Sequence, residues 1–425
     1  MFSYLLKSTK IFLSISYHIL RYQLYLSVYN DTVIQICNSL INHNYIFIKV
    51  IQWGIENIYD LHFNDELKEY FNTFSNNVPY TNLEQETAIL HVNNAIKYAA
   101  ATCNDKIIIE NNCIPINSGS VALIYKAQLN GKPIIIKVLR HNIKKKIEEN
   151  ILFLEYFFGT AFFKMITKQY TKVDFKKFIQ HIRHCLLNQC DFECEVNNGL
   201  LFKNNLKNKK NIVIPHVYKH FTDACSEIII MEYIDGPIAK NVQLYQLQTH
   251  FKTIRSLYFE SLFKYNILHG DFHLGNIIII DENKIGLIDF GIVYTITNEI
   301  SNSLFNILIL NINKKEIKYL LKGIKLFIKM ICKDDKKHEE IFIKLKNDDE
   351  LIHLFLKSKF SGSVLVTILN KLISMDGIEL NVYICNLMFA AISSLQTMDS
   401  AVSLIDDDNK SLSTFLKSYI EKFYY

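Results

Sequence analysis

The spacing of apolar residues changes along the chain, and these changes divide the sequence into regions. Between residues 31 and 90 the apolar residues fall at helical spacing, as Val33 and Cys37 do. Strand character, in the form of short β-branched runs, begins near Ile107. In residues 294–425 the pattern is again almost entirely helical. We therefore predict an α+β chain whose strands are concentrated in its middle.

The first of two predicted hairpins joins residues 121–129 to residues 133–139 through Asn130-Gly131, a pair typical of tight turns. Lys137 lies among aliphatic residues of the second strand, where an ammonium group needs water or a partner. It is either a strand lysine that reaches solvent or one that contacts phosphate. The small residues Ser118-Gly119-Ser120 precede this hairpin and predict a tight loop whose backbone N–H groups approach phosphate.

The second hairpin, residues 277–280 and 285–288, has polar residues on both flanks. Asp271 precedes it, Asn276 leads into it, and Asp289-Phe290-Gly291 follows it. Amide and carboxylate oxygens hold hard cations against the phosphates of ATP, and a second carboxylate can accept a proton from an attacking hydroxyl. The spacing is that of a protein-kinase catalytic loop and its metal-binding segment. The alternative interpretation is that these are only turn residues.

Residues 143–203 are predicted to be helical and contain a dense group of acids. Asp191 and Glu195 are four residues apart and share a helix face. We expect Glu195 to supply the carboxylate that Lys137 needs, with Asp191 as an additional polar or metal contact. The alternative is that both acids are solvated.

Two further strands are predicted, at residues 212–218 and 227–231. The second strand ends at Met231 and runs into a short polar connector, residues 232–236. An apolar strand followed by such a connector is typical of a hinge between two lobes.

Composition and charge change this picture little. A hydrophobic fraction of 49% supports real cores, and a net charge of +5 is mild. We interpret the basic runs as solvated loops, because no aromatic platform for nucleic acid accompanies them. Nine cysteines without a Cys-x-x-Cys pair suit a reducing compartment. Even Cys190 and Cys194, four residues apart, are expected to be small core residues, since a zinc site usually has closer ligand pairs.

The first 30 residues contain no acid and carry Lys7, Lys10 and Arg21 among apolar residues. This composition favours an organelle-targeting segment or a helix at a membrane surface. The charges interrupt every long apolar run there, so we do not expect a transmembrane span. We expect an intracellular location. The more specific alternatives are a mitochondrial and a membrane-associated location.

The order of these features resembles the UbiB/ABC1/ADCK group of atypical protein-kinase-like proteins, over roughly residues 40 to 400. The group's Lys-x-Gly-Gln motif falls on residues 49–52, and its His-Ala-Asp-Leu-His-Pro-Gly-Asn signature on residues 269–276. Its Asp-Phe-Gly falls on residues 289–291, with no Ala-Pro-Glu segment afterwards. The resemblance implies nucleotide contacts from Lys49, Gln52, Ser118, Gly119, Ser120, Val121, Ala122, Lys137, Glu195 and Met231.

Four positions depart from the group's pattern. Ile51 stands in place of Gly, Leu123 in place of Gln, Gln189 in place of Glu, and Leu274 in place of Pro. The polar residues that contact the nucleotide are retained. The resemblance therefore implies nucleotide binding more strongly than the group's own regulation, and its link to coenzyme Q and membrane lipids comes by analogy only.

The fold that the resemblance implies is a bilobal, α+β protein-kinase-like fold. Its segments would be a basic and hydrophobic stretch at residues 1–40, a helical extension at 41–105, a small β-rich lobe with a helical insertion at 106–235, and a large helical lobe at 236–425. The helical extension is expected to cover the cleft and to exclude protein substrates.

The implied activity is that of a Mg²⁺-dependent phosphotransferase or ATPase. Lys137 would contact the phosphates, Asp271 would act as the base, and Asn276 and Asp289 would hold Mg²⁺. The alternatives are a nucleotide-binding pseudokinase that acts as a scaffold and, ranked last, a small-molecule kinase of the aminoglycoside-phosphotransferase type. The expected partners are ATP, ADP and a lipid or membrane surface, without nucleic acid.

Overall fold

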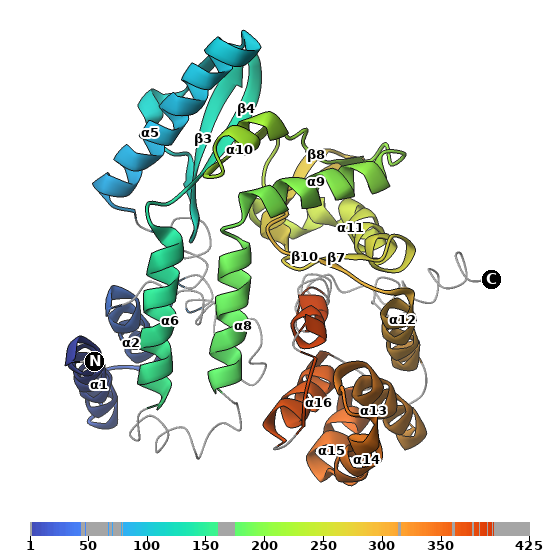
Figure 1. The fold of residues 1–425 in the computed structure, drawn as a ribbon. Coiled ribbons are helices and arrows are strands. Elements are labelled where there is room, and N and C mark those ends of the chain that lie inside the picture. The colour runs from blue at the N-terminus through green and yellow to red at the C-terminus, as the bar shows by residue number, and fades with distance from the viewer. Residues whose placement is uncertain are drawn as a thin grey trace. The chain divides into compact units, whose positions relative to one another are not determined.

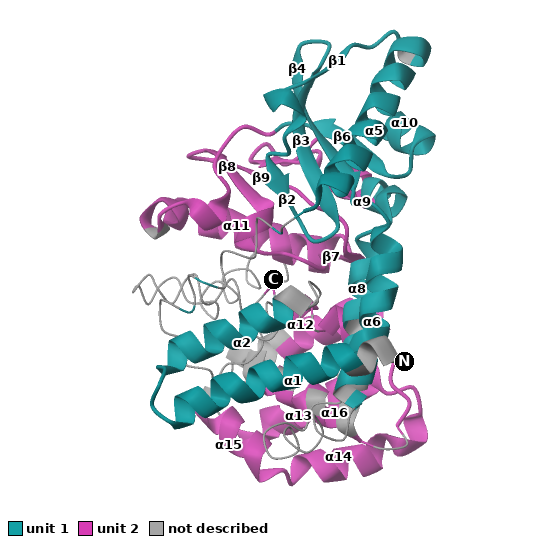
Figure 2. Cartoon of the chain, turned by 90° about the vertical axis from the view of Figure 1, so that its left-hand side faces the viewer, with its two compact units in different colours: residues 1–197, 216–233 teal, residues 198–215, 234–425 magenta. Residues whose placement is uncertain are grey.

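The chain divides into two compact units in a computed structural model (Figure 2). The structure describes residues 2–43, 80–159, 175–312, 316–358 and 362–375, with short runs between 378 and 394 and single residues between 47 and 78. Unit 1 comprises residues 1–197 and 216–233, and unit 2 comprises residues 198–215 and 234–425. These two units do not test the bounds of the four segments expected from the sequence, which stay a prediction.

Unit 1 is built on a five-stranded antiparallel sheet (Figure 1). Its strands are β1 (Ile107–Ile109), β2 (Asn117–Ser118), β3 (Ala122–Leu129), β4 (Lys132–Leu139) and β6 (Ile228–Glu232), in the order β1-β3-β4-β6 with β2 also paired to β3. The turn between β3 and β4 places Asn130 and Gly131 at positive φ, 52° and 80°, as a tight hairpin turn requires. This hairpin is the one that the sequence predicts.

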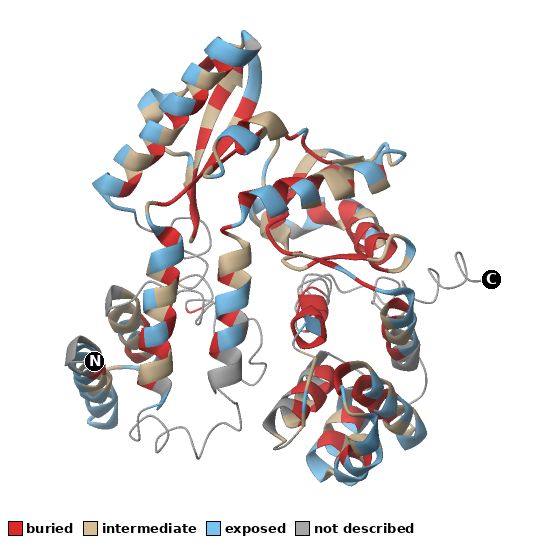
Figure 3. Cartoon of the chain, viewed as in Figure 1, coloured by how far each residue is buried: buried red, intermediate tan, exposed pale blue. Residues whose placement is uncertain are grey.

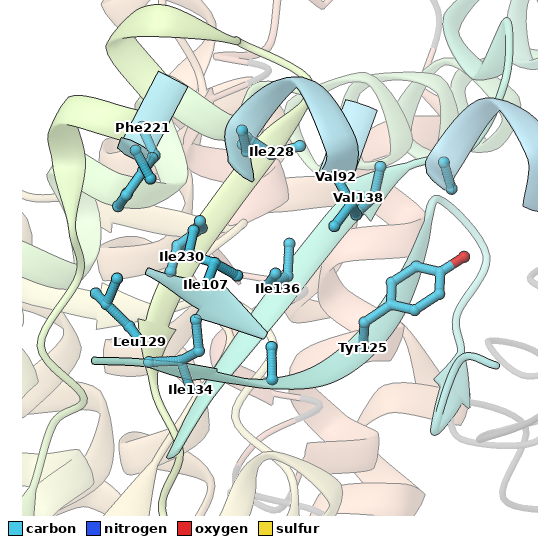
Figure 4. Close-up of a cluster of buried hydrophobic side chains, with 14 of the residues drawn as sticks. Val92, Ile107, Tyr125, Leu129, Ile134, Ile136, Val138, Phe221, Ile228 and Ile230 are labelled. Atoms are coloured by element: carbon cyan, nitrogen blue, oxygen red, sulfur yellow. The ribbon is translucent and has the colours of Figure 1, made fainter. Parts of the chain in front are cut away.

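One face of this sheet is covered by helix α5 (Asn82–Tyr98), which begins at a capping box between Thr81 and Glu84. The core between helix and sheet is entirely apolar apart from one tyrosine (Figure 4). Its members include Val92, Ile107, Tyr125, Leu129, Ile134, Ile136, Val138, Phe221, Ile228 and Ile230. Since successive strand residues point to opposite faces, Lys137 of β4 points away from this core.

The remaining helices of unit 1 are α1 (Phe2–Gln23), α2 (Tyr29–His43), α6 (Ile143–Gly159), α8 (Phe175–Asn188), the start of α9 (Phe192–Leu206) and α10 (Lys219–Ala224). The ring of Phe12 in α1 stacks on that of Phe157 in α6, with centroids 4.9 Å apart. Arg183 of α8 donates to both carboxylate oxygens of Glu148 in α6, at 2.6 and 2.9 Å.

The predicted strand at residues 212–218 is wrong over most of its length. Only β5 (Ile212–Val213) forms, followed by a single bridge between Val217 and Met231. Pro215 lacks the N–H group that a continuing strand would donate, which gives a physical reason for the break. The second predicted strand, which became β6, is confirmed.

Unit 2 contains two small ladders. In one, β9 (Lys284–Leu287) lies between β5 and β8 (Ile277–Asp281), and the predicted β8–β9 hairpin is confirmed. In the other, β7 (Ile267–His269) pairs antiparallel with β10 (Val293–Thr295). The sequence did not reveal this second pair, because three residues are too few to show a period. A further bond, from Gly270 N–H to the carbonyl of Ile292, extends the pairing by one residue.

Helices make up the rest of unit 2, as the pattern of its residues predicts. They are α11 (Leu244–Lys264), α12 (Asn298–Ile312), α13 (Ile317–Ile331), α14 (His338–Lys346), α15 (Asp349–Ser358) and α16 (Gly362–Ser374). Short 3-10 or π turns occupy Ala99–Cys103, Asn111–Cys113, Ala239–Asn241, Leu274–Asn276 and Asp335–Lys337 of the two units. The buried residues of α13 include Ile324 and Phe327. Figure 3 colours the buried residues of the described chain red. Within the described part of the chain, no helix has both the length and the apolarity needed to cross a bilayer.

Candidate functional site

Lys137 of β4 and Glu195 of α9 form a buried ion pair in unit 1. The Lys137 Nζ atom lies 2.7 and 2.8 Å from the two carboxylate oxygens, and the side chains are 10% and 4% exposed. The Phe192 ring centroid lies 5.5 Å from the same Nζ atom. Neither side chain is therefore a solvated surface group, and the pairing expected from the sequence is present.

Asp191 lies at the start of the same helix and has a different role. Its Oδ1 atom accepts the backbone N–H of Cys194 at 3.0 Å, which is the geometry of a helix N-cap. The carboxylate is exposed. Asp191 thus begins α9 one turn before Glu195.

The loop that begins at Ser118 is held by a second set of charged residues. The Ser118 hydroxyl donates to the carbonyl of Val78 at 2.6 Å and accepts from Nη2 of Arg140 at 2.6 Å. Arg140 in turn lies 3.6 Å from the carboxylate of Glu84, which also binds Lys146 at 2.8 Å. Burial alone would raise the pKa of Glu84, but the bonds from Lys146 and the Thr81 N–H, with the charge of Arg140, lower it.

This network uses most of the loop's polar groups. The N–H of Gly119 donates to the carbonyl of Ala122 at 2.9 Å, and the carbonyl of Val121 accepts from the N–H of Arg140. Ser120 is half-buried, and its hydroxyl has no hydrogen-bond partner among the residues that the structure describes. Ser120 is therefore the loop residue whose side chain remains available to a ligand.

In unit 2, the loop from His269 to Asn276 orders three polar side chains. Asn276 is buried and donates its Nδ2–H to the carbonyl of Asp271 at 2.9 Å, which leaves its Oδ1 atom as the atom able to bind a cation. The Nδ1 atom of His273 accepts the N–H of Gly275 at 3.0 Å. The Nε2 atom of His273 lies 3.5 Å from the carboxylate of Asp271 and 3.4 Å from Nδ2 of Asn276.

Asp289 has a left-handed backbone conformation, with φ of 62°. Aspartate tolerates this region better than most residues do, and its Oδ1 atom accepts the N–H of Gly291 at 3.2 Å. The next carbonyl, that of Phe290, accepts from Nδ2 of Asn198 at 2.9 Å. No local signal in the sequence marks Asn198, because asparagine is common throughout this chain.

His269 is buried beneath both segments, among the rings of Phe202, Phe272 and Phe290 at centroid distances of 5.6 to 5.8 Å. Its Nδ1 atom accepts the N–H of Asp271 at 3.3 Å. Burial lowers the pKa of His269, against the opposing charges of Asp271 and Asp289. His269 thus fixes the start of the loop that carries Asp271. The sequence marked it as the first residue of the family signature but gave it no role.

The oxygen atoms offered by unit 2 suit magnesium. Asp271 and Asp289 offer carboxylate oxygens and Asn276 offers an amide oxygen, and oxygen is the ligand atom that Mg²⁺ prefers. Met231 lies half-buried in β6, paired with Ile135. Lys49 and Gln52 lie outside the described residues, so their predicted nucleotide contacts stay predictions, as do the ligand-binding roles of the other site residues.

Comparison with solved structures gives only distant similarity. The complex of Rv3197 with erythromycin from Mycobacterium tuberculosis aligns with 87% of this chain and 91% of its own, at 15% identity and a TM-score of 0.45. The Rio2 kinase complex with ADP, Mg²⁺ and phosphoaspartate from Chaetomium thermophilum aligns with 74% of this chain and 86% of its own, at 14% identity and a TM-score of 0.30.

Curated relatives and a family model give a stronger result. A probable protein kinase UbiB from Shewanella oneidensis is 30% identical over 198 residues, and that of Shewanella pealeana is 27% identical over 197. Each match covers 44% of this chain and only 35% of the relative's own length. The model of the ABC1 atypical kinase-like domain matches residues 85–322, more than half of the chain and the stretch that contains both groups of site residues. The chain therefore belongs to the ABC1 atypical kinase-like family, whose α+β, kinase-like fold class the sequence predicted.

Proposed function

We propose that this chain binds ATP with Mg²⁺ and transfers or hydrolyses the terminal phosphate. The observation that carries the proposal is the buried pair of Lys137 and Glu195. A buried ion pair is on its own weak evidence of a contribution to stability, because desolvation opposes the attraction. A lysine oriented by both oxygens of a glutamate is instead well placed to meet a phosphate group.

The roles of the residues follow from their geometry within each unit. Lys137 would contact the α- and β-phosphates while Glu195 keeps its ammonium group in place. The Oδ1 atom of Asn276 and the carboxylate of Asp289 would hold Mg²⁺, which neutralises phosphate charge during transfer. Asp271 would accept the proton of the attacking hydroxyl or water, and the Nε2 atom of His273 lies 3.5 Å from its carboxylate.

The test uses the purified full chain and measures Mg²⁺-dependent ATP binding and ATP hydrolysis. Asp271→Asn should lower the rate of hydrolysis about 10²- to 10⁴-fold while ATP binding stays within about threefold. Asp281→Asn, in the exposed β8–β9 turn, is the matched control and should leave both unchanged. If Asp271→Asn changes neither measurement, the chain is a nucleotide-binding scaffold without turnover, and the proposed catalysis is wrong.

We also propose a membrane surface as the partner, on the evidence of helix α1. Leu6, Leu13 and Leu20 recur every seventh residue on its exposed side, at 52%, 66% and 53% exposure. Ser8 and Ile11 on the opposite side are buried against the rest of unit 1. An exposed apolar stripe with neighbouring basic residues suits the headgroup region of an anionic bilayer. By resemblance to the family, we propose that the phosphoacceptor is a lipid or a quinone-related molecule.

Vesicle binding tests this partner. The full chain should sediment with vesicles that contain anionic lipid, and Leu13→Glu should weaken that binding at least tenfold. Leu356→Glu on α15, a leucine that is 42% exposed, is the control and should not change it. If the two variants bind vesicles equally well, helix α1 does not support the proposal of a membrane partner.

A further inference from the structure

A group of three different side chains, His91, Cys225 and Glu227, lies in unit 1 apart from Lys137 and the Ser118 loop. His91 belongs to α5, and the other two belong to the connection between α10 and β6. The Cys225 Sγ atom lies 3.8 Å from Nδ1 of His91 and 3.4 Å from Oε2 of Glu227. All three donor atoms lie within 4.8 Å of one another. We propose that these residues bind a divalent transition-metal ion, with zinc preferred.

The spacing of the donor atoms supports a metal centre. A tetrahedral zinc ion holds its ligand atoms about 2.0 to 2.3 Å away, so neighbouring ligand atoms lie roughly 3.3 to 3.8 Å apart. The two distances from Cys225 already fall in this range. The third distance, between the donor atoms of His91 and Glu227, is no more than 4.8 Å.

The chemistry of the donors selects the class of ion. Thiolate, imidazole and carboxylate together are typical ligands of zinc, whereas magnesium and calcium take oxygen ligands almost exclusively. Three protein ligands leave a fourth position for water. None of the three residues is fully buried, so an ion and its water can reach the group from solvent.

The backbone around two of the ligands is already fixed. The N–H of Cys225 donates to the carbonyl of Phe221 at 2.9 Å, and its carbonyl accepts the N–H of Ile228 at 3.2 Å. The hydroxyl of Thr222 also donates to the carbonyl of Ile228, at 2.8 Å. Binding would therefore order mainly side chains, which keeps its entropic cost low.

Such an ion would link α5 to the edge of the sheet. His91 lies two turns after Glu84 on the same helix, and Glu84 binds the arginine that holds the Ser118 loop. The metal would thus stabilise the position of the helix that supports this loop.

Cobalt titration tests the site, because a Co²⁺–thiolate bond gives an intense near-ultraviolet charge-transfer band. The metal-free full chain should bind one equivalent of Co²⁺ with this band, zinc should displace it, and excess Mg²⁺ should not. Cys225→Ser should remove the band, and His91→Gln should weaken binding at least tenfold. Cys113→Ser, another half-buried cysteine of unit 1, should retain both the band and the affinity.

A thermal unfolding measurement separates loss of the site from loss of the fold. Zinc should raise the Tm of the wild-type chain and of Cys113→Ser, but not that of Cys225→Ser or of His91→Gln. A charge-transfer band that persists in Cys225→Ser, or a wild-type chain that binds no cobalt, would overturn the proposal.

Discussion

The two units hold their candidate functional groups by different means. In unit 1, Lys137 and Glu195 are almost fully buried and each is the other's charge partner. In unit 2, the carboxylate of Asp271 is 36% exposed, and the backbone orients the neighbouring groups. Asn276 binds a carbonyl group, and Asp289 accepts an N–H while its own backbone is left-handed.

Because of this difference, substitutions in the two units should affect stability and function differently. A buried charge that loses its partner destabilises the fold, whatever the protein does. A half-exposed carboxylate that is oriented by the backbone can be neutralised with little effect on folding, so its loss reports on function alone. Substitutions in unit 1 should therefore change both properties, and isosteric substitutions in unit 2 should change only ligand binding or turnover.

The largest effect is expected from Lys137→Met. Removal of the ammonium group leaves the carboxylate of Glu195 buried without this charge partner, which should lower the free energy of unfolding by about 3–5 kcal/mol. Mg²⁺–ATP binding should be lost as well. Chemical denaturation and nucleotide titration measure the two effects separately. Lys132→Met, at the exposed start of the same strand, should change neither.

A double variant sharpens this prediction. Lys137→Met with Glu195→Leu replaces the ion pair by two apolar side chains, which should recover most of the lost stability. ATP binding should not return. If the double variant binds ATP as the wild type does, the pair is structural and unit 1 has been assigned the wrong function.

Asp289→Asn should change Mg²⁺-dependent ATP binding much more than it changes stability. Asparagine also tolerates positive φ and is nearly isosteric, so the free energy of unfolding should stay within about 0.5 kcal/mol of the wild type. Mg²⁺-dependent ATP affinity should fall about 10- to 100-fold, since a charged metal ligand is lost. Asp289→Ala should lose the same affinity and a further 1 kcal/mol or so of stability, because alanine is strained at this φ. Unchanged Mg²⁺ dependence in both variants would contradict the assignment of Asp289 as a ligand.

Asn198→Ala tests whether the backbone of the Asp289 segment needs its side-chain support. Loss of the hydrogen bond to the Phe290 carbonyl should lower the free energy of unfolding by about 0.5–1.5 kcal/mol. The Mg²⁺ concentration needed for half-maximal ATP binding should rise, because the carboxylate of Asp289 is less well oriented. Asn205→Ala on the same helix removes a bond to Leu201 within that helix, and it should leave the Mg²⁺ requirement unchanged.

The features that the sequence predicted are those with a strong local signal. Asn130-Gly131 marks its hairpin by turn chemistry, and Lys137 stands out as a charge within an aliphatic strand. Glu195 was expected as the partner of Lys137 because a buried ammonium group needs a carboxylate and the family's pattern places a glutamate there. Local chemistry is therefore sufficient to predict β3 and β4, whereas the ion pair also needed the family resemblance.

The features that it missed depend on long-range contacts. The β7–β10 ladder pairs two three-residue strands that are far apart in the chain, and it places the Asp271 loop next to residues 291–292. Asn198 acts through a contact 92 residues away in the chain, and no local pattern distinguishes it from the other asparagines. His91 and Cys225 are likewise 134 residues apart, so no motif of closely spaced metal ligands contains both of them.

The smallest predicted effect concerns Glu84, the acid that supports the Ser118 loop through Arg140. Its pKa is lowered from the ordinary value of 4.5, so the charged form is favoured in the folded state. The stabilisation from this carboxylate is therefore fully present above about pH 4.5 and is lost as the pH falls toward the folded-state pKa. Denaturation of the wild type and of Glu84→Gln from pH 7 to pH 3 should show a stability difference that shrinks below about pH 4.5. Glu149→Gln, at an exposed position of α6, is the control for the loss of one surface carboxylate. A difference between wild type and Glu84→Gln that is constant over this range would mean that folding does not lower the pKa of Glu84.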